Sequence, residues 1–229
     1  MNNASRLIGK TIDALDGHIG SVHDLYFDDQ TLSVRYLVVD TGKWLPGRKV
    51  LIPPEAIVKP WHHQAAVAVK VTTEQIRSSP DVDTAMPVSR VAEELLHRHY
   101  QWTPYWESTI VPIPGIPPAP PALTAEEDRQ DAGKTAESLV DVRLRSANEL
   151  GGYHVMARDG EVGHVEDLLL DDDLSRVLFV VVEVKGWLFR KKVLVGPSLV
   201  SRVDWATSTV YVNANRQALK SAQEYNPAA

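Results

Sequence analysis

The same fourteen-residue motif occurs twice in this chain of 229 residues, as DGHIGSVHDLYFDD at residues 16–29 and as DGEVGHVEDLLLDD at residues 159–172. The offset of 143 positions holds without a gap for roughly seventy residues. Gly20 matches Gly163 and Trp44 matches Trp187, and the valine alternation coincides as well. Self-similarity of this kind predicts a tandem duplication of one small fold.

The repeat divides the chain into four predicted parts, which are copy one at residues 1–80, an extension at 81–107, a linker at 108–141 and copy two at 142–229. The linker contains VPIPGIPPAPPA, which holds six of the fifteen prolines, and an acidic stretch follows it. Proline fixes φ and lacks an N–H group, so this stretch predicts an extended spacer. It is either an inert tether, which we favour, or a ligand for a proline-recognising partner.

The pattern within one copy predicts short strands joined by turns. Asp16 and Gly17 suit a tight hairpin turn with positive φ at the glycine. Beyond it the apolar alternation slips, since Val22 and Leu25 cannot share one face of a regular strand, and the same slip recurs in copy two. This predicts a β-bulge. The structural turn residues of the two copies are Asp16, Gly17, Gly20, Asp159, Gly160 and Gly163.

Further strands are expected at residues 34–40, 49–57, 66–71 and at the matching positions of copy two, each copy ending in a short polar helix. The fold class is therefore mainly β, with two tandem small antiparallel β-barrels. The strand at 177–184 is apolar on both faces, so its outer face must pack against the other copy, the extension or a second subunit. We therefore expect a homodimer or tight packing of the two copies within one chain.

The extension after copy one predicts a short helix that begins near Ser89 as N-cap and stops before Pro104. Val91, Leu95 and His99 are spaced four apart and form its helical stripe. An aromatic segment follows, consisting of Tyr100, Trp102, Tyr105 and Trp106. These rings either cover a barrel or anchor a partner, since Tyr and Trp are common at interfaces.

Composition excludes several classes of function. The chain has no cysteine, which excludes disulfides, thiol nucleophiles and cysteine zinc sites. The net charge of −6 argues against a dedicated nucleic-acid binder, which would cluster Lys and Arg. Neither a signal peptide nor a run as long as a membrane span is evident, so the expected location is cytoplasmic, with peripheral attachment to a membrane as the variant.

The sequence contains no residue pattern that predicts a catalytic or metal-binding site. Ser21, His23 and Asp24 are the residue types of a hydrolase triad, but His23 and Asp24 are strand neighbours that point to opposite faces. The aspartates at 28–29 and 171–173 lack the ligand spacing of a calcium loop. The neighbouring histidine pairs do not share a helix face at i, i+4. We predict no enzyme activity, no cofactor, and no catalytic or metal-binding residue.

The two basic loops, Lys43–Lys49 and Lys185–Lys192, interleave aromatic and basic residues. They suit anionic lipid, nucleic-acid phosphate or an acidic partner. We favour the simpler interpretation, in which the tryptophans pack inward and the cations are solvated. The candidate interaction residues of the chain are Trp44, Arg48, Lys49, Trp187, Arg190, Lys191 and Lys192 in the loops, and Tyr100, Trp102, Tyr105 and Trp106 in the aromatic segment.

An early glycine, the pattern DGxxGxVxDLxxDD, an apolar strand, a Trp-bearing loop and KVLIPPEAI together resemble the PRC-barrel family. The resemblance covers both copies, about two thirds of the chain. It implies small β-barrels used for assembly and docking, with no shared catalytic residue. Members include the cytoplasmic part of the photosynthetic reaction-centre H subunit, the ribosome-maturation factor RimM, and stand-alone bacterial proteins, which this chain resembles most.

The function expected from these observations is a non-enzymatic cytoplasmic interaction protein whose protein partner is unknown. The first alternative is a membrane-peripheral adaptor of a photosynthetic or electron-transfer complex, as the likeness to the H subunit implies. The second alternative is an RNA- or ribosome-associated factor, as the likeness to RimM implies, although the acidic balance disfavours nucleic acid.

Overall fold

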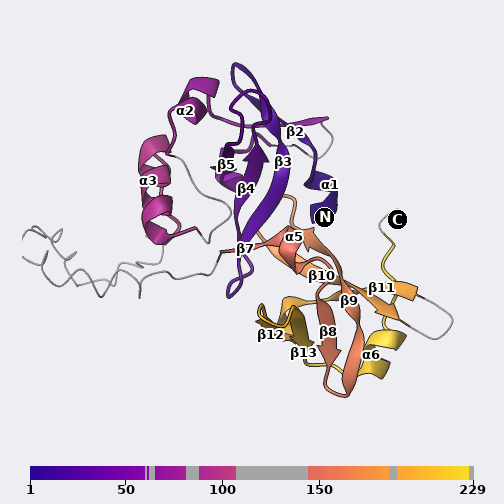
Figure 1. Cartoon of the computed structure of the whole chain (residues 1–229). Coiled ribbons are helices and arrows are strands. Elements are labelled where there is room, and N and C mark those ends of the chain that lie inside the picture. Colours follow the sequence, from indigo (N-terminus) through magenta and orange to yellow (C-terminus); the bar gives the residue numbers. More distant parts are fainter. Residues whose placement is uncertain (60, 62–64, 81–87, 107–143, 186–189, 227–229) are drawn as a thin grey trace, which may run out of the picture. The chain divides into compact units, whose positions relative to one another are not determined.

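The structure, a computed structural model, describes residues 1–59, 61, 65–80, 88–106, 144–185 and 190–226. The chain forms two compact units, which are unit one (Met1–Arg77 with Arg143–Ala229) and unit two (Ser78–Val142). Both copies of the repeat belong to unit one (Figure 1). The predicted linker at 108–141 lies outside the described residues.

Copy one folds into short strands and turns, as its apolar alternation predicts. The strands are β1 (Asn2–Asn3), β2 (Thr11–Ala14), β3 (Gly17–Asp28), β4 (Val34–Asp40), β5 (Lys49–Ile52) and β6 (Ala66–Ala68). The helices are α1 (Ala4–Leu7), the 3₁₀ turn η1 (Pro54–Ala56) and α2 (Thr73–Arg77). The polar segment after the last strand forms α2, which confirms that prediction.

Copy two repeats the same order of elements, with one additional strand before the last. Its strands are β7 (Leu144–Ser146), β8 (His154–Ala157), β9 (Gly160–Leu170), β10 (Val177–Lys185), β11 (Arg190–Val195), β12 (Val200–Asp204) and β13 (Thr209–Val212). Its helices are α5 (Ala147–Leu150), the 3₁₀ turn η4 (Pro197–Leu199) and α6 (Arg216–Ser221). The mainly β fold class is confirmed.

The two sheets are mainly antiparallel, as predicted, but each also contains one parallel pair of strands, which the sequence does not predict. The strand orders are β5-β4-β3-β2-β6 and β11-β10-β9-β8-β13-β12. The pairs β2·β6 and β8·β13 run parallel. In copy two, η4 bends the chain without reversing it, so β12 runs in the direction of β11 and β13 returns parallel to β8. Within the described residues no ladder joins β11 to β12, so closure into a barrel is not detected.

A β-bulge interrupts the long strand of each copy, as the slip in apolar alternation predicts. The register between β3 and β4 skips His23, and the register between β9 and β10 skips Glu166. A bulge leaves one extra residue unpaired and bends its strand. The bulge prediction is therefore confirmed in both copies.

Two of the motif glycines are required by the close approach of neighbouring strands. A Cβ atom on Gly20 would lie 2.0 Å from the carbonyl oxygen of Asp40, and one on Gly163 would lie 1.9 Å from that of Glu183. Real Cβ atoms do not approach backbone oxygen so closely, so no other residue fits.

The prediction that Gly17 needs a positive φ is wrong. Its φ is not positive; the turn residues are Leu15 and Asp16, and Gly17 begins β3. Its counterpart Gly160 does have a positive φ of 124°. The two hairpins therefore differ in backbone conformation despite their shared Asp-Gly sequence.

The N-terminal arm of each copy leaves its own sheet and joins the sheet of the other copy. Arm one, formed by β1 and α1, pairs through β1 with β9. Arm two, formed by β7 and α5, pairs through β7 with β3. The registers match at the repeat offset, since Asn3 pairs with Leu169 while Ser146 pairs with Tyr26. The exchange is therefore reciprocal.

A second reciprocal contact joins the turns that precede β4 and β10. The N–H of Val34 donates to the carbonyl oxygen of Ser175, and the N–H of Val177 donates to that of Leu32, both at 2.9 Å. The bridge between them pairs Ser33 with Arg176, which are equivalent positions of the repeat. The two copies thus contact each other as a pseudo-twofold pair inside one chain.

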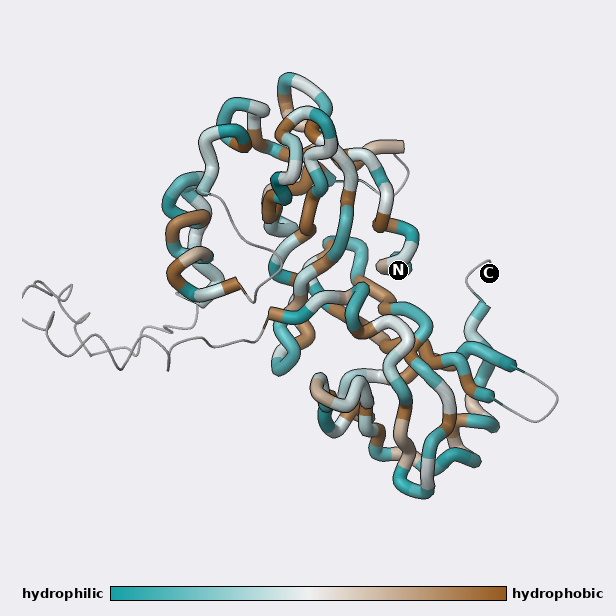
Figure 2. Tube along the Cα trace, viewed as in Figure 1, coloured by the Kyte–Doolittle hydropathy of each residue, from teal (hydrophilic) through white to brown (hydrophobic). Residues whose placement is uncertain are grey.

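The core lies along the central strands of the two sheets. Hydrophobic residues run through the strands of both sheets, and the connecting turns are mostly hydrophilic (Figure 2). In β10, Val180, Val181 and Val182 are all buried, so both faces of this strand are covered. Burial of such side chains is the main stabilising contribution to a small domain.

In unit two the structure describes helix α3 (Arg90–Tyr100) and the aromatic segment after it. The Ser89 side chain accepts a hydrogen bond from the N–H of Ala92, which confirms the predicted N-cap. The helix ends at a left-handed residue, Gln101, with φ of 57°, three positions before Pro104.

The predicted stripe of α3 is not its buried face. Val91 is 66% exposed and Leu95 is 46% exposed, whereas Glu93, Leu96 and Tyr100 are buried. The spacing of four identifies the helix correctly, but it does not identify the side that is covered.

Candidate functional site

Asp24 follows the bulge of copy one and holds arm two. Its Oδ1 accepts hydrogen bonds from the backbone N–H of Leu25 at 2.7 Å and of Asn148 at 3.1 Å. Its Oδ2 accepts one from Ser146 Oγ at 2.5 Å. A carboxylate in this position satisfies N–H groups at the start of a helix, here α5. The prediction that Asp24 accepts backbone hydrogen bonds at the bulge is confirmed.

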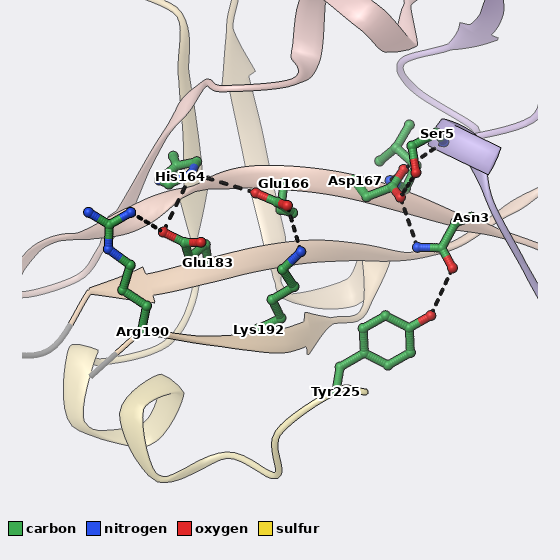
Figure 3. Close-up of polar contacts among 10 residues, drawn as sticks. Asn3, Ser5, His164, Glu166, Asp167, Glu183, Arg190, Lys192 and Tyr225 are labelled. Atoms are coloured by element: carbon green, nitrogen blue, oxygen red, sulfur yellow. Dashed lines mark hydrogen bonds and ion pairs between the residues drawn. The ribbon is translucent and has the colours of Figure 1, made fainter. Parts of the chain in front are cut away.

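Asp167, the counterpart in copy two, holds arm one in the same way (Figure 3). It accepts hydrogen bonds from Asn3 Nδ2 at 2.8 Å, from the N–H of Ser5 at 3.1 Å and from Ser5 Oγ at 2.5 Å. The N–H of Leu168 donates to it at 2.8 Å, confirming the same prediction for this copy. Tyr225 Oη donates to Asn3 Oδ1 at 3.0 Å, which ties the C-terminal segment to the arm.

The arrangement around Ser21, His23 and Asp24 does not form a hydrolase triad. Asp24 is occupied by arm two, and His23 Nε2 lies 2.9 Å from Lys49 Nζ. In the described part of the chain none of the three side chains bonds to another of them. A nucleophile and its base need hydrogen-bond contact, so this geometry offers no activated serine.

The acidic turns contact tryptophans of the opposite copy. Trp61 Nε1 donates to the carbonyl oxygen of Asp172 at 3.0 Å, and Trp205 Nε1 donates to Asp29 Oδ2 at 3.1 Å. Arg145 of arm two also contacts Asp29, at 3.3 Å. These turns are therefore part of the contact between copies, and Asp29 already has an indole and a guanidinium as partners.

The first basic loop folds back on copy one. Trp44 is half-buried, and the Arg77 guanidinium lies 5.7 Å from its ring centroid. Arg48 donates to the carbonyl oxygen of Arg77 at 2.8 Å, and Lys49 contacts His23. Arg48 and Lys49 of this loop therefore contribute to the local structure.

The described part of the second basic loop is also engaged in internal contacts, while Trp187 lies outside the described residues. Arg190 pairs with Glu183 at 3.4 Å. Lys191 donates to the carbonyl oxygen of Ala222 at 2.7 Å.

A charged cluster lies on β9, β10 and β11 of copy two (Figure 3). His164 Nε2 lies 3.8 Å from Glu166 Oε2 and 3.9 Å from Glu183 Oε1. Lys192 Nζ donates to Glu166 Oε1 at 2.6 Å. This hydrogen bond raises the pKa of Lys192 above its ordinary value, against the opposing effect of desolvation.

In unit two, the aromatic segment packs on α3. The rings of Tyr100 and Trp102 stack at 4.1 Å between centroids. The guanidinium of Arg90 lies 4.3 Å from the centroid of Trp106, and the His97 ring lies 5.0 Å from the same ring. Ring stacking and cation–π contacts of this kind hold the segment in one conformation.

Tyr105 anchors the end of the segment. Its hydroxyl donates to Glu93 at 3.0 Å and accepts from Arg90 at 3.1 Å. Burial and the adjacent negative charge of Glu93 raise the pKa of Tyr105 to about 12. The phenol is therefore neutral at physiological pH and serves as a hydrogen-bond donor to the buried carboxylate.

A hollow of about 470 Å³ opens beside the aromatic segment. It is lined by Glu94, His97, Arg98, Gln101, Trp102, Thr103, Pro104 and Trp106. Trp102 and Trp106 are half-buried and Arg98 is exposed. The hollow thus presents two ordered indole rings together with charged groups that reach solvent.

The sequence profile of the PRC-barrel domain matches residues 1–76 and 143–219, which includes both copies of the repeat. The chain belongs to the PRC-barrel family. Among curated proteins, none shows significant similarity to it. Within the described residues of this PRC-barrel protein, no helix has the length and apolar character needed to cross a membrane.

Two features of this PRC-barrel protein are not predicted from its sequence. The exchange of arms has no local signal, because Asn3 and Asp167 are 164 positions apart. The charged cluster on copy two has only a weak one, the pattern His-x-Glu at residues 164–166. Its third member, Glu183, is placed beside His164 by the pairing of β9 with β10.

Proposed function

We propose that this PRC-barrel protein is a non-enzymatic interaction module that binds a partner protein through the aromatic segment of unit two. The observation that carries the proposal is the hollow lined by Trp102 and Trp106, whose rings are ordered by contacts with α3 but remain partly exposed. Pre-ordered indole rings lose little conformational entropy on binding, which is why tryptophan often anchors protein interfaces.

The side chains of unit one support the non-enzymatic part of the proposal. Asp24 and Asp167, the motif carboxylates, accept hydrogen bonds from the exchanged arms. Residues with such structural partners are poor candidates for acid–base catalysis, which requires contact with a substrate.

The basic loops give less support to binding of lipid or RNA. Arg48 and Lys191 donate to carbonyl oxygens, and Arg190 and Lys192 pair with glutamates. An anionic surface would have to displace these contacts. Binding of this kind would weaken steeply with added salt, whereas docking on the aromatic segment would weaken little.

The test is a crosslinked pull-down of the tagged full-length protein from its native cells, repeated with Arg98→Glu. Arg98 is exposed and lines the hollow, so charge reversal there should leave the fold intact. The matched control is Arg158→Glu, an exposed arginine on copy two. Thermal unfolding of each variant checks the fold.

Partner recovery that falls with Arg98→Glu and with Trp102→Ala, but not with Arg158→Glu, supports docking at the hollow. Equal recovery of the partner with all variants overturns it. Recovery of this chain alone also overturns it and indicates a self-assembling protein.

A further inference from the structure

Three potential metal ligands converge on one face of copy two, apart from the docking hollow proposed above. The Nε2 atom of His164 lies 3.8 Å from Glu166 Oε2 and 3.9 Å from Glu183 Oε1, and all three ligand atoms lie within 4.8 Å of one another. A point equidistant from three such atoms lies no more than about 2.5 Å from each, close to the 2.0–2.2 Å of zinc–ligand bonds.

The backbone fixes this convergence. His164 and Glu183 are direct partners in the pairing of β9 with β10, next to the close approach at Gly163. Glu166 is the extra residue of the bulge. A bulge re-aims its side chain relative to a regular strand. Ligands that project from two paired strands need only small side-chain adjustments to close on an ion.

Neighbouring cations orient the carboxylates without blocking the shared position. Lys192 donates to Oε1 of Glu166, which leaves Oε2 directed toward His164 (Figure 3). A hydrogen bond to the second oxygen of a ligating carboxylate is a common feature of metal sites. Arg190 contacts the same Oε1 of Glu183 that faces His164, but its side chain is 73% exposed and can rotate into solvent. Exposed pairs of this kind contribute little stability.

We propose that His164, Glu166 and Glu183 bind one divalent first-row transition-metal ion, with water completing its coordination. One imidazole nitrogen and two carboxylate oxygens form a mixed donor set that suits Zn²⁺, Co²⁺ or Mn²⁺ better than Ca²⁺, which prefers six or more oxygens. The ion would link β9 to β10 across the bulge. No metal site is predicted from the sequence, because the histidine pairs and acidic turns considered there are each local in the chain, whereas Glu183 is brought to His164 by strand pairing.

Copy one does not repeat the site. The equivalent positions are Ser21, His23 and Asp40, and Asp40 Oδ1 accepts a hydrogen bond from the N–H of Gly42 at 2.7 Å. A hydroxyl is a weak ligand for a transition metal, and His23 already contacts Lys49. The donor set is therefore a property of copy two.

The test measures Zn²⁺ binding to the full-length protein by calorimetric titration, with Co²⁺ absorption as a report on coordination geometry. His164→Ala and Glu183→Gln each remove one ligand. His18→Ala is the matched control, because His18 is an exposed histidine on β3 of copy one that contacts one carboxylate, Asp13, at 3.1 Å. Zinc bound elsewhere on the chain contributes to every titration, so only differences between variants count.

The expected result is one class of Zn²⁺ site that is present in the wild type and in His18→Ala, and that binds at least about tenfold more weakly in both ligand variants. Zn²⁺ should raise the melting temperature of the wild type more than that of either ligand variant, since binding to the native state stabilises it. Thermal unfolding without metal confirms that the variants fold. Equal Zn²⁺ binding by wild type and His164→Ala, or no site in the wild type up to millimolar Zn²⁺, overturns the proposal.

Discussion

Copy one carries Ser21, His23 and Asp40 where copy two carries His164, Glu166 and Glu183, all on the same face of the same two strands. By contrast, the glycine before the bulge and the aspartate after it are the same in both copies. Glycine allows the close strand approach in both copies, and an aspartate after the bulge holds the opposite arm in both.

The comparison separates two kinds of position in the repeat. The glycines of close approach and the aspartates that hold the arms are the same in both copies, whereas residues on the exposed face of the bulge differ in charge and ligand type. The glycines and aspartates are therefore shared structural elements, and the exposed faces of the bulges are where the copies differ.

The largest effect is expected from alanine at the glycines of close approach. Gly20→Ala and Gly163→Ala each place a Cβ atom within 2.0 Å of a backbone oxygen, so β3 or β9 must move away from its partner. We expect a loss of more than about 4 kcal/mol in each case, and the urea dependence of unfolding measures it.

Gly152→Ala is the control for this prediction. Gly152 has φ of +86° but no atom near its missing Cβ. Only backbone strain opposes alanine there, so about 1–2 kcal/mol is expected. An equal loss at Gly152 and Gly163 would contradict the argument from close approach.

A smaller effect is expected from loss of the aspartates that hold the arms. Asp24→Ala removes the acceptor of a Ser146 hydroxyl and of two backbone N–H groups, which should cost about 2–3 kcal/mol. Asp167 is more exposed, so Asp167→Ala should cost about 1–2 kcal/mol. Chemical unfolding monitored by circular dichroism tests this order. If the two variants lose the same stability, the deeper burial of Asp24 does not strengthen its hold on arm two relative to that of Asp167 on arm one.

The indole hydrogen bonds between the copies should contribute less to stability than the two aspartates do. Trp61→Phe keeps an aromatic ring, although a smaller one, and removes the hydrogen bond to the carbonyl oxygen of Asp172; loss of this bond should cost about 1 kcal/mol. Trp205→Phe removes the bond to Asp29, which keeps Arg145 as a partner, so its cost should be smaller. Melting temperatures of the two single variants and of the double variant measure these costs. A larger loss of stability for Trp205→Phe than for Trp61→Phe would contradict the role given to Arg145.

The smallest effect concerns acid sensitivity at the hairpins. The N–H of Thr73 donates to Asp16 and lowers its pKa, and the N–H of Arg216 does the same for Asp159. A lowered folded-state pKa adds stability that is complete above the unfolded value and is lost as the pH falls through the folded value. Asp16→Asn and Asp159→Asn should therefore lower the melting temperature slightly at pH 7 and flatten its decline below about pH 4. Thermal scans between pH 2 and pH 7 test both; an unchanged decline contradicts this assignment.

The parts of the fold that follow from the sequence are those with local causes. The bulges follow from the slip between Val22 and Leu25, and the start of α3 follows from Ser89, because each pattern spans only a few residues. The parallel strand pairs and the exchange of arms depend on contacts between distant segments, so no short pattern contains them.

The candidate site divides in the same way. The sequence identifies the aromatic segment by composition, but not the contacts that Tyr105 makes with Glu93. It identifies the cations of the basic loops, but not that Arg190 and Lys192 already have glutamate partners. Those partners come from other strands, and only the strand register brings them together.

The exchanged arms also have a consequence for synthesis on the ribosome. Copy one lacks the strand that Ser146 supplies to β3 until the chain has been made well past the linker, and arm one has no partner until β9 exists. From the end of copy one at residue 80 to the start of β7 at Leu144, 64 further residues are translated while one sheet edge of copy one remains unpaired. Unpaired edges invite association with other chains. Once both copies are made, each finds its partner within the same molecule, so assembly of the pair is independent of protein concentration.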